Sequence, residues 1–255
     1  MARRGTAKKL RDESASPYSP SASLVLSTSA LLLSIVTGAW VLPSQLWGVD
    51  LTSEPLTCIK SSCALFLPAA LMLFSFPPFS PSLSVQHSQS PRRGIQPRGQ
   101  LMRRLVHIAT AIALTCLGAF AAALAATAFG APTTFQSVPV TLHWSFLLSL
   151  LTVLPSALLF GSHSHLWRSV LLQFSPASLP EACVVTSAHG AVVGAWVGAW
   201  PMPLDWEKPW QAWPISSTYG MLSGFLIGLL LPLIATWLLP PIIVSQLLQR
   251  KQHSA

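Results

Sequence analysis

The chain has 255 residues, of which 51% are hydrophobic and only 9% are charged, and its formal net charge is +8. A soluble globular domain has about 25% charged residues, so this composition excludes an ordinary water-soluble fold, which needs more polar surface. The positive charge does not indicate a nucleic-acid-binding protein either, because the Lys and Arg residues are divided among short segments instead of forming one basic patch.

The first 22 residues carry five basic side chains and are then rich in Ser and Pro, a composition typical of a disordered tail. The apolar stretch that follows is too long for the core of a signal peptide and has no clear cleavage site after it. We therefore interpret this stretch as a first membrane span and the tail before it as cytoplasmic.

Six apolar segments are long enough to cross a bilayer core, which is about 30 Å thick and requires about 20 helical residues. The second segment contains three prolines, which membrane helices tolerate where neighbouring helices satisfy the freed backbone groups. The sequence predicts an all-α, six-span membrane helix bundle over residues 23–240, with a Ser/Pro/Arg-rich linker at 80–104 and a short cytoplasmic tail at 241–255. The predicted spans are approximately 23–42, 63–79, 105–129, 139–160, 182–200 and 217–239.

The basic residues assign an orientation to these spans. With six spans, thirteen of the fifteen Lys and Arg residues lie on one side, and only Lys60 and Lys208 lie on the other. Cytoplasmic segments of membrane proteins are enriched in Lys and Arg, so both termini are predicted to be cytoplasmic. The sequence leaves open a disulfide between Cys58 and Cys63, which lie close together near the opposite face.

Glycines recur at every fourth position in the fifth and sixth predicted spans. This spacing places them on one helix face, where the missing side chains let another backbone approach closely. The third span has small residues at similar spacing. We expect the last two spans to form a tight hairpin, or each to offer its glycine face to another helix. The predicted packing positions, within the chain or toward a partner, are Gly118, Ala122, Gly190, Gly194, Gly198, Gly220, Gly224 and Gly228.

The connection between these two spans combines aromatic, charged and proline residues. Five of the ten tryptophans lie within residues 196–213. Trp is enriched at the headgroup level of bilayers, which accounts for the tryptophans at the span ends. Because proline restricts both itself and the preceding residue, we expect a rigid cap here. It consists of Pro201, Pro203, Leu204, Asp205, Trp206, Glu207, Pro209, Trp210, Trp213 and Pro214.

The segment 198–215, Gly-Ala-Trp-Pro-Met-Pro-Leu-Asp-Trp-Glu-Lys-Pro-Trp-Gln-Ala-Trp-Pro-Ile, resembles the signature of the PIG-F family. The members of this family are endoplasmic reticulum membrane proteins of glycosylphosphatidylinositol (GPI) anchor biosynthesis. The resemblance covers mainly residues 182–240, and the Pro-Met-Pro variant is closer to fungal than to animal members. It implies a multi-pass protein of the endoplasmic reticulum membrane.

An accessory function follows from this resemblance. PIG-F-like proteins stabilise large catalytic ethanolamine phosphate transferases, PIG-O and PIG-G in animals, which transfer phosphoethanolamine to the mannoses of the GPI lipid on the lumenal face. The charge-based orientation, obtained without the resemblance, places the signature loop on that same face. The expected partners are therefore a PIG-O-like or PIG-G-like transferase and membrane lipids, and not nucleic acid.

The sequence contains none of the catalytic motifs HExxH, GxSxG or P-loop. Asp205 and Glu207 lie two positions apart beside Lys208, which favours a local charge network over acid–base catalysis or cation binding. His189 lies within the fifth predicted span, where a polar residue is costly and often functional. We favour a hydrogen bond from His189 to a neighbouring helix, and we predict no cofactor, no metal site and no catalysis by this chain.

Two functions are compatible with these features. The favoured one is a non-catalytic subunit whose small-residue helix faces accept helices of the large enzyme and whose loop braces it. The alternative is a lipid-handling protein, a transferase or transporter of phosphatidylethanolamine or GPI, in which Asp205, Glu207 and His189 line a cavity. No charged residue lies well inside the predicted spans, which counts against a charge-driven pump but not against a passive lipid groove.

Overall fold

The structure is a computed structural model in which every long element of the described part is a helix. The elements are α4 (Pro55–Ser75), α6 (Pro97–Ala128), α7 (Val138–Phe160), α9 (Leu179–Ala199), the short 3-10 helix η4 (Pro209–Gln211) and α10 (Ile215–Leu238). The residues that the structure describes are 50–75, 97–161, 178–204 and 206–238, with Ser34, Gly38, Trp167, Leu172, Phe174 and Pro176.

Four of these helices, α6, α7, α9 and α10, are long and apolar enough to cross a membrane by their length and composition. In α4 the apolar part is the shorter stretch Pro55–Leu71. The first predicted span lies outside the described residues apart from Ser34 and Gly38. The chain is therefore an all-helical membrane protein with four such helices in the described part, and the number six stays a prediction.

The helix α6 begins eight residues before the predicted start of the third span, at 97 instead of 105. The last part of the predicted linker 80–104 is therefore helical, which corrects the boundary drawn from hydrophobicity. Pro97 suits the first turn of a helix, and the following Leu, Met and Arg residues are good helix formers. An apolar pattern locates the membrane-crossing part of a helix but not a polar extension of it.

Cys58 and Cys63 both lie within α4, where they are buried free thiols. Five positions along an α-helix correspond to a rotation of about 140°, so the two side chains leave different faces of α4. The disulfide that the sequence left open is therefore not formed.

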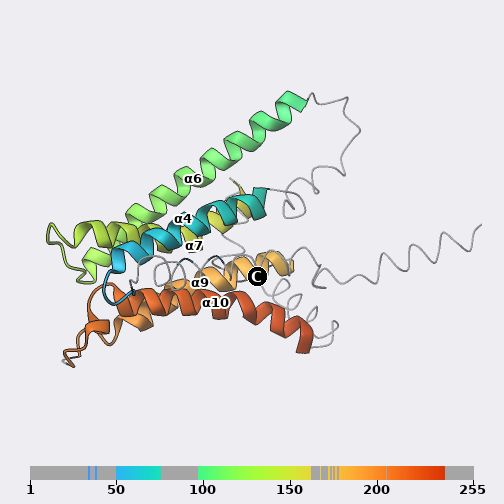
Figure 1. Cartoon of the computed structure of the whole chain (residues 1–255). Coiled ribbons are helices and arrows are strands. Elements are labelled where there is room, and N and C mark those ends of the chain that lie inside the picture. The colour runs from blue at the N-terminus through green and yellow to red at the C-terminus, as the bar shows by residue number, and fades with distance from the viewer. Residues whose placement is uncertain are drawn as a thin grey trace, which may run out of the picture.

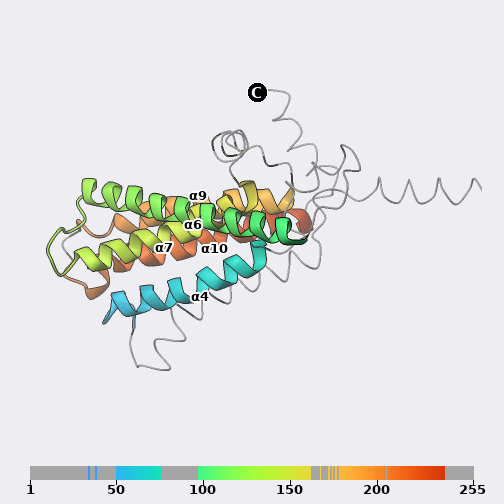
Figure 2. The ribbon, with the colours of Figure 1, turned by 90° about the horizontal axis from the view of Figure 1, so that it is seen from above.

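The helix α7 lies at the centre of the bundle. It packs against α4, α6 and α9, whereas α10 pairs mainly with α9. Figure 1 shows α6 on one side of α4 and α7, with α9 and α10 on the other side. Figure 2 shows α4 running along one side of the bundle. Of the four spans, α7 is the most buried and α6 the least.

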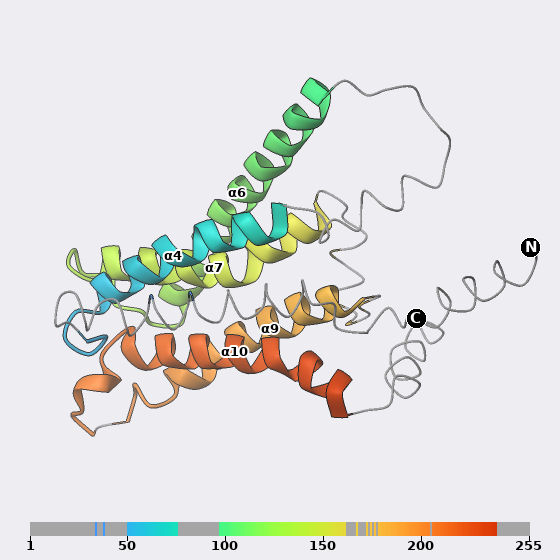
Figure 3. The same ribbon diagram turned by 45° about the vertical axis from the view of Figure 1, so that its right-hand side comes forward.

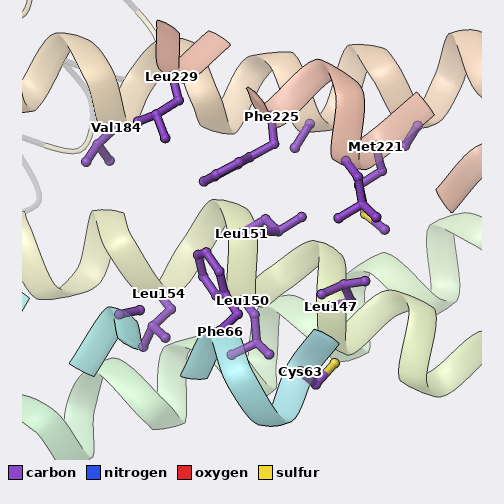
Figure 4. Packing of buried hydrophobic residues seen from close by; sticks show 14 of the residues in the cluster. Cys63, Phe66, Leu147, Leu150, Leu151, Leu154, Val184, Met221, Phe225 and Leu229 are labelled. Carbon is purple, nitrogen blue, oxygen red and sulfur yellow. The ribbon is translucent and has the colours of Figure 1, made fainter. Parts of the chain in front are cut away.

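The core forms where α4, α7 and α10 meet (Figure 4). Phe66 of α4 stands edge-on to Phe225 of α10, with 5.8 Å between the ring centroids. The α7 leucines Leu150 and Leu151 are fully buried in the same cluster. Lipid tails are as apolar as these side chains, so the contact stabilises the bundle through van der Waals packing instead of through the exclusion of water.

Replacing Phe66 with Ala is expected to lower the thermal unfolding midpoint in a mild detergent, followed by tryptophan fluorescence. Phe→Ala replacements in buried cores cost about 3–5 kcal/mol. The part of this cost that comes from transfer out of water is missing between membrane helices, so we expect a loss at or below the lower end of that range. Phe120→Ala on α6, whose side chain is 62% exposed, is the matched control. Equal losses in the two variants would contradict this description of the core.

Candidate functional site: a tryptophan loop on a glycine hairpin

The helices α9 and α10 form an antiparallel hairpin in which the predicted glycines face one another. A Cβ atom added at Gly190, Gly194, Gly220 or Gly224 would collide with a backbone carbonyl oxygen of the facing helix. The two helices are therefore in direct backbone contact, and the contact advances by four residues on each helix. The facing pairs are Thr186 with Gly228, Gly190 with Gly224, Gly194 with Gly220 and Gly198 with Ser216.

Hydroxyl groups form hydrogen bonds across this hairpin near both of its ends. Thr186 Oγ1 donates to the carbonyl oxygen of Gly228 at 2.5 Å, and Ser217 Oγ donates to that of Ala195 at 3.0 Å. One such bond between membrane helices contributes about 0.6–2 kcal/mol. The extended backbone contact between these two bonds is therefore the main source of attraction, and the bonds define its register.

The glycine face of α9 packs against the glycine face of α10. Of the two arrangements open from the sequence, the structure has the hairpin, and neither glycine face is left for an outside helix. The faces of α9 and α10 that point away from the chain instead carry large exposed side chains, among them Val193, Trp196 and Ile227.

Gly118 of α6 has a similar place against α7. A Cβ atom at this position would lie 2.6 Å from Ser149 Oγ and 2.8 Å from Val153 Cγ2. The Ser149 hydroxyl donates to the carbonyl oxygen of Thr115 at 2.6 Å, so a hydrogen bond accompanies the close approach. Ala122, one turn further along α6, is half-buried. The small residues of α6 thus pack within the chain.

The connection between α9 and α10, residues 200–214, is named here the tryptophan loop. It closes the end of the hairpin that also holds the connection from α6 to α7 (Figure 1). Its backbone turns twice, with Leu204 N donating to Pro201 O at 3.2 Å and Gln211 N donating to Lys208 O at 3.0 Å. Glu207 has a φ of 49°, a left-handed conformation that is uncommon outside glycine and persists only where neighbouring contacts impose it.

Gln211 supplies such contacts from the interior of the loop. Its Nε2 donates to the carbonyl oxygens of Pro201 and Leu204, both at 2.7 Å, and its Oε1 accepts from Lys208 N at 3.0 Å. One buried amide side chain thus joins both halves of the loop. Gln211 was not among the residues predicted from the sequence. The signal was present, because proline at the first and glutamine at the third position of a helix is the pattern in which glutamine reaches back to the preceding backbone.

The second half of the loop is fixed to α7. Trp213 Nε1 donates to Thr141 Oγ1 at 2.9 Å, and the Trp213 ring lies 5.0 Å from that of Trp144. Pro214, after a cis peptide bond, is buried. Thr141 and Trp144 could not be found from the sequence, since they precede the loop by about 70 residues.

Most of the other predicted loop residues that the structure describes are exposed. Trp206 and Trp210 form an edge-on pair with 6.0 Å between ring centroids, and both are exposed. Pro203, Leu204 and Pro209 are also exposed, whereas Pro201 is half-buried. The loop therefore has buried anchors on one side and an exposed pair of tryptophans on the other. Tryptophan is enriched among the residues that contribute most to binding at protein interfaces.

The predicted charge network is not seen among the residues that can be described. Glu207 and Lys208 are both exposed, and no ion pair joins them. Asp205 lies outside the described residues. In the described part of the chain, no three His, Cys, Asp or Glu side chains lie close enough together to hold a metal ion.

The side chain of His189 forms its hydrogen bond within its own helix. The prediction of a hydrogen bond to a neighbouring helix is therefore wrong. Its Nδ1 donates to the carbonyl oxygen of Val185 at 2.8 Å, and its ring lies 4.2 Å from that of Phe174. The carbonyl one turn back is the nearest acceptor for a histidine on a helix. Ten residues of α9, about 15 Å, separate His189 from the end of α9 at Ala199. This separation disfavours a single cavity lined by His189 and the loop carboxylates.

Replacing Gly194 with Ala is expected to destabilise the hairpin by about 1–3 kcal/mol, the usual cost of overpacking. The new Cβ would meet the backbone of Gly220, which cannot rotate away as a side chain could. The measurement is the fraction of protein that stays monodisperse after heating in detergent. Val193→Ala, on the outward face of the same helix, should behave like the wild type. A fully stable Gly194→Ala variant would show that the backbones are not in contact.

Replacing Gln211 with Met is expected to speed hydrogen–deuterium exchange at the loop amides of Leu204, Trp206 and Gln211. Methionine keeps a similar volume but removes the three hydrogen bonds, so the loop can open more often. Exchange within α9 should not change. Gln136→Met, at an exposed site of the connection between α6 and α7, is the control. Unchanged exchange in Gln211→Met would mean that the prolines alone hold the loop.

Comparisons with known proteins identify relatives of this chain. The family described as "GPI biosynthesis protein family Pig-F" matches residues 45–233. A mouse protein named "GPI ethanolamine phosphate transferase, stabilizing subunit" is 37% identical over 110 residues, which are 43% of this chain and 50% of the mouse protein. A Pyricularia oryzae protein named "Glycosylphosphatidylinositol anchor biosynthesis protein 11" is 40% identical over 100 residues, 39% of this chain and 36% of that protein.

A Schizosaccharomyces pombe protein named "PIGF/3-ketodihydrosphingosine reductase fusion protein" is 30% identical over 172 residues, 66% of this chain and 32% of that protein. The chain thus spans about half the length, or less, of these relatives. No solved structure matches the chain. The family match covers about three quarters of the sequence, including α9, the tryptophan loop and most of α10. The resemblance seen in the loop is therefore confirmed, and the chain belongs to the PIG-F family of GPI biosynthesis proteins.

Proposed function

We propose that this chain is a non-catalytic membrane subunit that binds and stabilises an ethanolamine phosphate transferase of GPI-anchor biosynthesis. It thereby supports phosphoethanolamine addition to GPI mannoses in the endoplasmic reticulum. The observation that carries the proposal is the name of the mouse and human relatives, each 37% identical over 110 residues: "GPI ethanolamine phosphate transferase, stabilizing subunit". The partner would be a PIG-O-like or PIG-G-like transferase.

The geometry of the tryptophan loop supports a binding function. Trp206 and Trp210 are exposed on a loop whose backbone is held by Gln211 and anchored by Trp213. A surface that is rigid before binding loses little conformational entropy when a partner covers it. In this proposal the two tryptophans are buried by the transferase at the membrane surface.

The outward helix faces would complete the interface. Because the glycine faces of α9 and α10 close on each other, transferase helices would pack on the exposed sides of α6, α9 or α10. We further propose six spans with both termini in the cytoplasm, which puts the tryptophan loop on the lumenal side. The support for this orientation is the distribution of Lys and Arg along the sequence.

The test is affinity purification of the tagged full chain in a mild detergent, with the copurifying proteins identified and quantified. We expect a large ethanolamine phosphate transferase in near-equal amount. Trp206→Ala combined with Trp210→Ala should lower the cellular abundance of that transferase several-fold, with little change in its activity per molecule. The physical reason is that the uncovered interface of the transferase leaves it unstable.

The matched control is Phe129→Ala combined with Phe135→Ala. These two aromatic side chains are 86% and 97% exposed at the same end of the bundle, and their loss should leave the transferase level unchanged. Normal transferase abundance with abolished transfer in the tryptophan variant would contradict a stabilising function. Purification of the chain with lipid alone would favour the lipid-handling alternative.

A further inference from the structure

The N-terminal turns of α6, Pro97–Val106, diverge from the other helices (Figures 1 and 3). His107 marks the beginning of the contact with α7, since a Cβ atom at Gly161 would lie 3.3 Å from its Nε2. Before it, every side chain from Leu101 to Val106 is exposed. The side chains of residues 101–106 therefore make no packed contact with the described part of the bundle.

The length of α6 places this segment at the edge of the bilayer. Its 32 residues correspond to about 48 Å of helix, whereas the hydrocarbon core is about 30 Å thick. An α6 that stood upright in the bilayer would therefore extend beyond the core, and its polar end is the part expected to do so. The charged residues of α6 gather at its N-terminal end, where Arg98, Arg103 and Arg104 fall within its first eight positions. The opposite end of α6 lies at the end of the bundle that holds the tryptophan loop (Figure 1).

Among the residues that the structure describes, Arg103 and Arg104 have no carboxylate partner. Arg103 and Arg104 are exposed, and no ion pair joins either of them to a described carboxylate. The sequence contains no Asp or Glu between Glu54 and Glu181. An anion is therefore the counterpart that this segment lacks.

The side chains around the arginines indicate that this anion belongs to a lipid. Leu101, Met102, Leu105 and Val106 are 52–62% exposed beside Arg103 and Arg104. Such side chains are stable next to acyl chains but not in water. Arginine can lay its apolar stem along them while its guanidinium group reaches the headgroup level, where it binds phosphate through paired N–H groups.

We propose that Arg103 and Arg104 bind the phosphate of an anionic phospholipid at the end of α6 opposite the tryptophan loop. The apolar side chains that flank them contact the acyl chains of the same lipid. This site goes beyond the proposed subunit function and does not depend on it, because no transferase is needed to form it.

The experiment is native mass spectrometry of the purified full chain in a neutral detergent. Phosphatidylserine and phosphatidylcholine with identical acyl chains are added in equal amounts. We expect preferential retention of phosphatidylserine. Basic residues near a membrane surface attract anionic lipids. Arg103→Gln combined with Arg104→Gln should therefore abolish most of the phosphatidylserine preference, while phosphatidylcholine binding stays the same.

The control is Lys60→Gln combined with Lys208→Gln, which also removes two positive charges, but from exposed sites outside α6. This control should keep the preference for phosphatidylserine. Arg103→Lys combined with Arg104→Lys should keep most of it. Unfolding followed by tryptophan fluorescence in phosphatidylcholine micelles verifies that the Gln variant is folded. An unchanged preference in that variant, or an equal loss in the control, would overturn the proposal. Displacement of phosphatidylserine by millimolar inorganic phosphate would also overturn it, because the site would then bind free anions.

Discussion

The backbone contact between α9 and α10 is the constraint on which the candidate site depends. In lipid, burial of apolar side chains does not by itself draw helices together, so close packing and hydrogen bonds must do so. Side chains are absent where the helices cross, and the two backbones meet from the Thr186–Gly228 pair to the Gly198–Ser216 pair. The ends of α9 and α10 are thereby held side by side. Residues 200–214, which connect α9 to α10, are 15 in number. Most connections between neighbouring elements have about 4–6 residues, so this one is longer than is needed to join the two helices.

The excess length explains why the tryptophan loop folds on itself. A connection of this length at a membrane surface has many backbone groups that need partners. Gln211 satisfies three of them from within the loop, and Trp213 ties its end to Thr141 of α7. The central helix α7 also packs against α4 and α6. The position of the exposed tryptophans is therefore set by the whole bundle, and a change in helix packing would move the surface that the proposed partner contacts.

The two ends of the bundle differ in chemistry. The connection between α9 and α10 lies at one end, and the N-terminal turns of α6 diverge at the other (Figure 3). The first carries the paired tryptophans, and the second carries the arginines of α6. A protein that stabilises a large enzyme through such a loop needs a defined depth and tilt in the bilayer, because a shift of a few ångströms would misplace the loop. Arginines bound to headgroups at the far end of a long helix would hold that depth.

The sequence by itself determined the helical membrane class, the approximate extent of the four long apolar helices, and the family through its loop residues. These properties are local: the bilayer thickness sets the length of an apolar run, and a glycine spacing of four defines a helix face. The start of α6 was missed because its first turns are polar, although their residues favour a helix. Only the tertiary structure decided that the glycine faces meet each other, that Gln211 closes the loop and that His189 bonds to its own helix. The physical reason is that a packing face or a polar group acquires its partner only when segments distant in the sequence come together, as Trp213 and Thr141 do.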